Sequence, residues 1–109
     1  MKIEVNMFLS SDTVGTASIN NPVYGIIRAI NKKRPEELPF ESKTERYELI
    51  VEIDNTKLSW IANATSLRVL AAKYGTDSDR WVDKKIRLWS VEQDVLGRMR
   101  KIVYAGPEI

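Results

Sequence analysis

The sequence predicts an all-β fold that carries a single helix. Most segments alternate apolar with polar residues at the period of two expected for half-buried strands, and only one segment changes to a helical period. Turn-forming residues separate these segments at short intervals. With 109 residues, of which 43% are hydrophobic and 29% charged, the chain is expected to form one soluble domain over residues 1–109 with a small core.

Three strands are predicted before the helix. Residues 23–31 are apolar and β-branched, and a polar loop with two prolines follows at residues 32–43. Residues 44–54 alternate regularly, and the pair Asp54-Asn55 forms a tight turn into residues 57–63, so these two strands should make a hairpin. Residues 2–6 suggest a further short strand.

The helix is predicted between residues 65 and 75. Its apolar residues fall at i, i+3, i+4 and i+7, which places them on one face: Leu67, Leu70, Ala71 and Tyr74. Thr65 or Ser66 is expected to cap the first N–H groups, and Gly75 can take the left-handed conformation that ends a helix.

Two more strands follow an acidic turn, at residues 84–92 and 98–106, with a turn at residues 94–97 between them. Three strands, a helix and then a hairpin are the element order of the OB-fold. We therefore expect an OB-fold-like five-stranded Greek-key barrel with the helix between strands three and four. An SH3-like barrel is the main alternative, and it would not normally carry a three-turn helix at this place.

The composition narrows the chemistry. The chain has no cysteine and no histidine, which excludes disulfides and thiolate metal sites and removes the usual zinc ligand and proton shuttle. No nucleophile–base arrangement or glycine-rich phosphate loop is present, so we expect no enzyme, no catalytic residues and no cofactor. No apolar run is long enough for a membrane span, and no secretory signal is recognisable; a cytoplasmic location is expected.

The acidic turn resembles the start of a calcium loop but does not complete one. Its aspartates are Asp77, Asp79 and Asp83. A calcium loop needs glycine at its sixth position and glutamate at its twelfth, where this chain has Val82 and Leu88. We therefore predict a polar turn and no metal site.

One segment carries a resemblance to a known family. Residues 63–89 contain "NATS", "KYG", "DSD" and "RWVDKKIRLW". This resembles the signature of a family of small phage and prophage proteins with an OB-like pattern: Asn-x-Thr-Asn, Tyr-Gly, an acidic turn, and Trp-(Ile/Val)-Gly-Lys-Lys-Ile before an aromatic residue. Ser66 replaces the second Asn and Asp83 replaces the Gly. Weaker similarity extends to residues 7–19 and 103–107. Some members are thought to bind single-stranded DNA, which the resemblance implies here, in a host cell if the protein is phage-encoded.

Aromatic residues on the predicted strands are the first candidates for binding. Alternation places Trp89 beside Arg87 on the face opposite Ile86 and Leu88. A base can stack on such an indole while Lys and Arg contact phosphates; the alternative is that Trp89 covers a cluster under residues 1–20. Core packing and binding are equally compatible with Trp60, whereas Trp81 is expected in the core under the helix. Tyr104 adds an aromatic surface or completes the core.

Basic residues near the loops that flank an OB-fold binding face are the second candidates. They are Lys32, Lys33 and Arg34 after strand one, Arg46 on strand two, and Arg98, Arg100 and Lys101 after the last turn. Residues 84–101 hold six basic and two acidic side chains, although the net charge of the chain is only +2. The positive charge of the first group is reduced by three nearby glutamates, Glu36, Glu37 and Glu41.

These observations predict a protein that binds single-stranded DNA or RNA by aromatic stacking and phosphate contacts. The alternative is a non-enzymatic module that docks a phage or host protein in a replication, recombination or virion complex. The near-neutral charge and the glutamates of the second strand favour this alternative. No membrane partner is expected, and the sequence leaves a homodimer open.

Overall fold

The computed structural model describes residues 9, 14–15, 17–18, 20–38 and 43–108. In chain order the described elements are β1 (Val23–Lys33), the 3₁₀ turn η1 (Pro35–Glu37), β2 (Arg46–Ile53), β3 (Thr56–Ala62), α2 (Ala64–Tyr74), the 3₁₀ turn η2 (Ser78–Trp81), β4 (Lys85–Val95) and β5 (Arg98–Pro107). The predicted mostly-β chain with one helix is thus confirmed for these residues. The strand suggested at residues 2–6 lies outside them.

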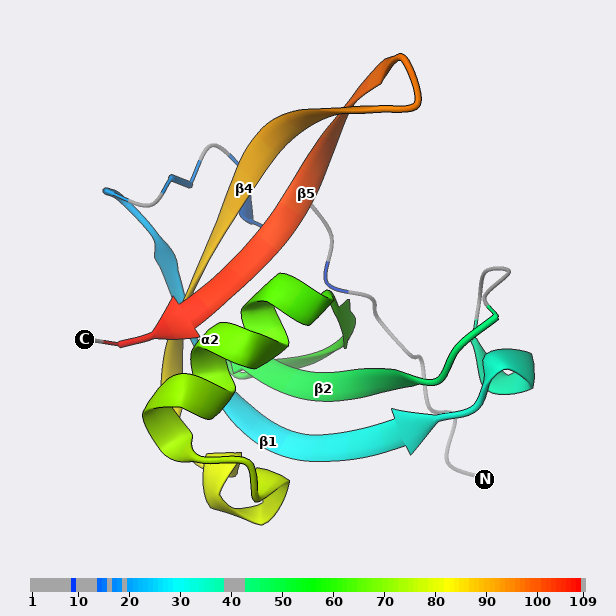
Figure 1. The fold of residues 1–109 in the computed structure, drawn as a ribbon. Coiled ribbons are helices and arrows are strands. Elements are labelled where there is room, and N and C mark those ends of the chain that lie inside the picture. The colour runs from blue at the N-terminus through cyan, green and yellow to red at the C-terminus, as the bar shows by residue number, and fades with distance from the viewer. Residues whose placement is uncertain (1–8, 10–13, 16, 19, 39–42, 109) are drawn as a thin grey trace, which may run out of the picture.

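The described strands form one antiparallel sheet in the order β3-β2-β1-β4-β5. The sheet curls into a half-barrel, and α2 lies across its open side next to β5 (Figure 1). Two-residue turns join β2 to β3 and β4 to β5, because Ile53 pairs with Thr56 and Val95 pairs with Arg98. β4 is longer than predicted, and the last turn is correspondingly shorter.

Alternation along the strands sends one set of apolar residues into the half-barrel. The innermost of these are Ile27 of β1, Leu49 and Val51 of β2, Ile86 and Leu88 of β4, and Leu70 of α2, all with no exposed surface. Gly25 makes close packing possible, because a Cβ at this position would lie 2.6 Å from Cγ1 of Val51. The core thus depends on a missing side chain as well as on those present.

The start of α2 is attached to the free edge of β5 by side chains. Asn63 caps the helix, accepting a hydrogen bond from the backbone N–H of Ser66 at 2.9 Å, and its Nδ2 donates to the carbonyl of Val103 at 2.8 Å. The prediction that Thr65 or Ser66 caps the helix is therefore wrong. Gly75, with φ of 92°, ends the helix as predicted. In the described ranges no helix is both long and apolar enough to cross a membrane.

Candidate functional site

The hairpin of β4 and β5 presents two faces of different chemistry. On the face turned away from the half-barrel, which we call the outer face, the register pairs Arg87 with Gly106, Trp89 with Tyr104, Val91 with Ile102, Gln93 with Arg100, and Val95 with Arg98. The other face, which we call the inner face, supplies Ile86, Leu88, Val103 and Ala105 to the core. Near the turn it continues with Glu92 opposite Lys101 and Asp94 opposite Met99.

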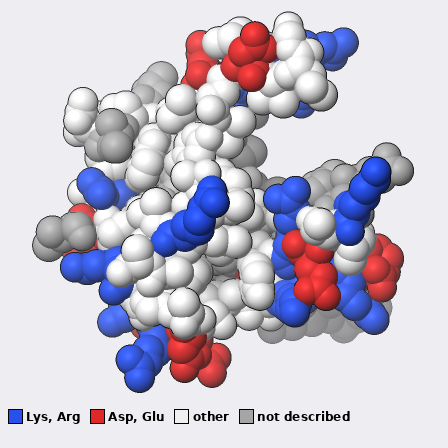
Figure 2. All heavy atoms as spheres, in the orientation of Figure 1, with Lys and Arg blue, Asp and Glu red and all other residues white. Residues whose placement is uncertain are grey.

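This register separates the charges of the hairpin. Among these pairs the charged residues of the outer face are three arginines, whereas Glu92 and Asp94 lie on the inner face. Lys85, two residues before Arg87 on β4, lies 4.0 Å from Glu108. Arg98 and Arg100 are exposed and form no ion pair with any described residue. Figure 2 shows acidic and basic side chains together on the projecting hairpin. The outer face is therefore the positively charged side of a hairpin that is mixed overall.

Trp89 is held on the outer face by the absence of a side chain at Gly106. A Cβ at position 106 would lie 3.3 Å from Cη2 of the indole and 3.7 Å from Nη2 of Arg87. Arg87 donates from Nε to the carbonyl of Pro107 at 2.7 Å. The indole packs against the backbone of β5 and keeps part of its surface exposed.

Tyr104 lies directly opposite Trp89 and extends in the other direction. Its hydroxyl donates a hydrogen bond to Oε1 of Gln93, four residues further along β4 than Trp89. The two aromatic rings thus occupy successive parts of the outer face. Side chains with exposed π-surfaces and nearby guanidinium groups can stack on bases and contact phosphates.

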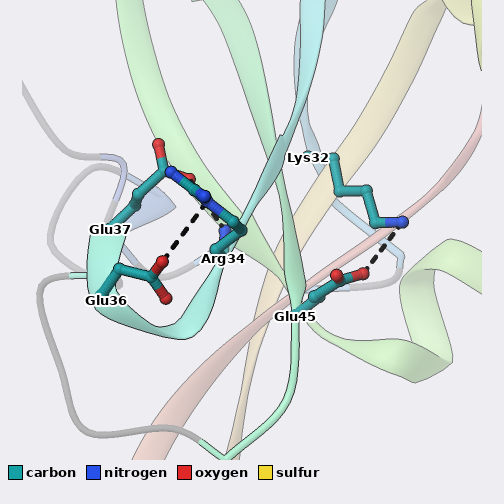
Figure 3. Close-up of polar contacts among 5 residues, drawn as sticks. All are labelled: Lys32, Arg34, Glu36, Glu37 and Glu45. Carbon is teal, nitrogen blue, oxygen red and sulfur yellow. Dashed lines mark hydrogen bonds and ion pairs between the residues drawn. The ribbon is translucent and has the colours of Figure 1, made fainter.

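The basic residues at the end of β1 are matched by glutamates, as Figure 3 shows. Lys32 Nζ lies 2.9 Å from the Glu45 carboxylate, and Arg34 Nε lies 3.4 Å from Glu36 and 3.2 Å from Glu37. Hydrogen bonding to Glu45 raises the pKa of Lys32. Hydrogen bonds from the backbone and then the side chain of Arg34 lower the pKa of Glu37. The positive charges of Lys32 and Arg34 are therefore balanced by neighbouring glutamates.

The next basic residue of β1, Lys33, also has a glutamate partner. Lys33 Nζ lies 3.8 Å from Glu48, which also accepts hydrogen bonds from Asn31 and Ser59. Arg46 is opposite Lys33, and its buried Nε has no hydrogen-bond partner among the described residues. Interleaved red and blue side chains mark this end of the molecule in Figure 2.

The structure does not bring the two predicted basic groups together. Val23, at the start of β1, pairs with Leu88 at the base of the β4–β5 hairpin, whereas Lys33 lies at the far end of the same strand. Ten residues of extended strand span up to ~33 Å. Lys32, Lys33, Arg34 and Arg46 therefore lie apart from the outer face.

Two of the three tryptophans belong to the core. Trp60 is only 6% exposed, so its ring has no open face for a base, and core packing is what the structure shows. Trp81 is buried as predicted, and its Nε1 donates to the carbonyl of Gly75 at 2.8 Å, which ties η2 to the end of α2. Trp89 is half-buried and is the most exposed of the three tryptophans.

Two of the three aspartates of the acidic turn have structural partners. Asp77 accepts a hydrogen bond from the backbone N–H of Asp79, and Asp83 receives one from Nη1 of Arg28 at 2.8 Å. Arg28 also contacts Glu52 at 3.1 Å. Among the described residues, no three acidic side chains come together in a way that could hold a metal ion.

Comparison with models of protein families, with curated proteins and with solved structures gives no match for this chain. The sequence analysis did not identify Gly106 and Gln93 as part of the outer face. It also grouped Lys101 with Arg100, although the two side chains lie on opposite faces of the hairpin. The opposite placement of these two residues could have been predicted, because a two-residue turn at Leu96-Gly97 fixes which residues of the two strands share a face.

Proposed function

We propose that this protein binds single-stranded DNA or RNA along the outer face of the β4–β5 hairpin. The observation that carries the proposal is the Trp89–Tyr104 pair on a face whose cross-strand pairs with β5 include three arginines and no acidic residue. Bases stack on the two rings, and Arg98 and Arg100 contact the phosphates that follow along the strand. Arg87 supports the indole and presents its remaining N–H groups at the base of the hairpin.

The strand order and the helix next to β5 support an OB-fold-like assignment for the half-barrel. In that fold the loop between the fourth and fifth strands flanks the ligand. We include in this proposal that the fold is an OB-fold, that its strands follow Greek-key topology, and that the chain is related to the phage family described above. The proposed surface omits Trp60, which is buried, and Lys101, which lies on the inner face opposite Glu92.

Titration with oligo-dT, followed by tryptophan fluorescence at two salt concentrations, tests the proposal. Because Trp60 and Trp81 are buried, quenching should report on Trp89. Replacing Trp89 by alanine should weaken binding by about 1–3 kcal/mol, and affinity should fall as salt rises. Absence of binding at low salt would reject the proposal.

Two adjacent residues provide a matched pair of variants. Arg100→Ala and Lys101→Ala remove the same charge from neighbouring positions on opposite faces. Arg100→Ala should weaken binding and lower the salt dependence by about one phosphate contact, whereas Lys101→Ala should change both less. Equal effects would show that charge alone matters and that the outer face has no special role.

The second candidate function is docking of a protein partner. It is favoured by the glutamates that neutralise the cations at the end of β1 and by the net charge of only +2. A protein that binds no oligonucleotide at low salt, yet retains a defined partner that Trp89→Ala releases, would establish this function.

A further inference from the structure

The turn between β4 and β5 contains Leu96, whose backbone conformation and solvent exposure are both unfavourable for the folded state. Leu96 and Gly97 both have positive φ, 53° and 80°, as a two-residue type I′ turn requires. A bulky residue in this backbone region is an outlier, because its Cβ crowds the following carbonyl. Leu96 is also fully exposed, so its side chain gains nothing from burial within this chain.

The β2–β3 turn of the same protein provides an internal comparison. It has the same length and also has positive φ at both central residues, but these are Asp54 and Asn55. Asn, Asp and Gly are the residues that this turn prefers. Leu96, in the equivalent place, has an unfavourable backbone conformation and exposes its apolar side chain to water. Contact with a ligand would account for it.

The part of the hairpin that carries Leu96 stands away from the half-barrel (Figure 1). β1 pairs with β4 only as far as Leu88, and the helix start contacts β5 at Val103 and Ala105. Beyond these contacts the hairpin continues as a two-stranded arm, residues 91–102. Arg98 and Arg100 lie on its outer face, in line with Tyr104 and Trp89.

We propose that this arm recognises the junction between a duplex and a single strand, with Leu96 packed against the terminal base pair. The inference rests on the proposed function, since the single strand would continue from Leu96 over Tyr104 and Trp89. Leucine is among the apolar residues that proteins insert at base steps. Insertion within a duplex requires unstacking, whereas a duplex end already exposes the face of a base pair.

The charges on the outer face of the arm favour nucleic acid over an apolar protein groove. Its outer face has two arginines without an ion pair among the described residues and no acidic side chain. Six residues separate the Val95–Arg98 pair from the Trp89–Tyr104 pair, about 20 Å along a strand. At 3.4 Å per stacked nucleotide this corresponds to roughly six nucleotides, fewer if the strand is stretched.

The test compares three DNA probes: a hairpin with a dT overhang, the same dT strand alone, and the blunt hairpin. The key variant is Leu96→Asn, which gives the turn its preferred Asn-Gly sequence and should leave folding unchanged or improved. The wild type should bind the overhang hairpin roughly tenfold more tightly than free dT, as expected for burying a leucine side chain. Leu96→Asn should lose that preference and keep its affinity for free dT.

The outcomes separate this inference from the proposed function. A wild type that binds free dT but does not prefer the junction overturns the inference alone, as does a Leu96→Asn variant that retains the preference. Equal affinity for the blunt and overhang hairpins overturns it as well, because the single strand then contributes nothing. If free dT does not bind at all, the proposed function fails and this inference fails with it.

Discussion

The backbone N–H of Ala105 donates a hydrogen bond to Oγ of Ser66 at 2.9 Å, and Ser66 has no exposed surface. This contact joins the first turn of α2 to the edge of β5. Asn63 adds a second bond, to Val103, two residues earlier on the same strand. Side chains therefore satisfy polar groups that another strand would satisfy in a continuous sheet. The motif "NATS" is thus explained by the fold, independently of any ligand.

Replacing Ser66 by alanine should destabilise the protein by about 1–3 kcal/mol, because it leaves the buried N–H of Ala105 without a partner. Urea unfolding followed by circular dichroism measures the change. Thr65→Ala is the matched control, since Thr65 is exposed and lies in the same helical turn. Equal stability of the Ser66→Ala variant and the wild type would contradict the role assigned to this bond.

Gly25→Ala should destabilise the core by about 1–3 kcal/mol, as overpacking typically does. The added methyl group would meet Cγ1 of Val51 at 2.6 Å and Cγ1 of Ile53 at 3.1 Å. The double variant Gly25→Ala/Val51→Ala provides the check. It should lose less stability than the sum of the two single changes, since truncating Val51 removes the clash. Additive losses would mean that the two positions are not in contact.

The sequence predicted which face of a strand each residue occupies better than it predicted whether that face is buried or exposed. Alternation correctly placed Ile86 and Leu88 in the core and Trp89 on the opposite face, because the pleat imposes a period of two on every strand. It could not settle Trp60, whose burial depends on what packs over β3. Local pattern fixes direction, whereas tertiary packing fixes exposure.

The ion pairs at the end of β1 show why the basic candidates were harder to predict. Lys32 contacts Glu45 and Lys33 contacts Glu48 because the register of β1 against β2 brings these residues together across a loop. A count of basic residues along the chain contains no such information. The helix cap was misassigned for a simpler reason: Asn63, Thr65 and Ser66 are all good capping residues within four positions.

Asp83 should tolerate glycine or asparagine much better than alanine. Its φ of 68° lies in the left-handed region, where alanine costs about 1–2 kcal/mol and Gly and Asn are more easily accommodated. Asp83 also accepts a hydrogen bond from Nη1 of Arg28 at 2.8 Å. Thermal unfolding of the three variants gives the order. An alanine variant as stable as the glycine variant would show that the backbone conformation is different.

The pKa of Glu37 should lie below its usual value, because it accepts hydrogen bonds from the backbone and side chain of Arg34. A lowered pKa in the folded state means that the contribution to stability is present above the unfolded pKa and is lost as the pH falls through the folded value. Carboxyl NMR titration measures this directly. Arg34→Ala should move the pKa of Glu37 upward, towards the ordinary value of a glutamate side chain.

Gly106→Ala should move the indole of Trp89 while leaving the fold intact. The new methyl group would stand 3.3 Å from Cη2 of Trp89, so the ring at the surface must shift by a few tenths of an ångström. We expect altered tryptophan emission and weaker oligo-dT binding, together with a smaller loss of stability than Gly25→Ala causes, because Trp89 is only half-buried whereas Val51 is fully buried. Emission spectra, oligonucleotide titration and urea unfolding of both variants provide the comparison. Unchanged oligonucleotide affinity despite a shifted emission spectrum would mean that stacking on Trp89 does not contribute to binding.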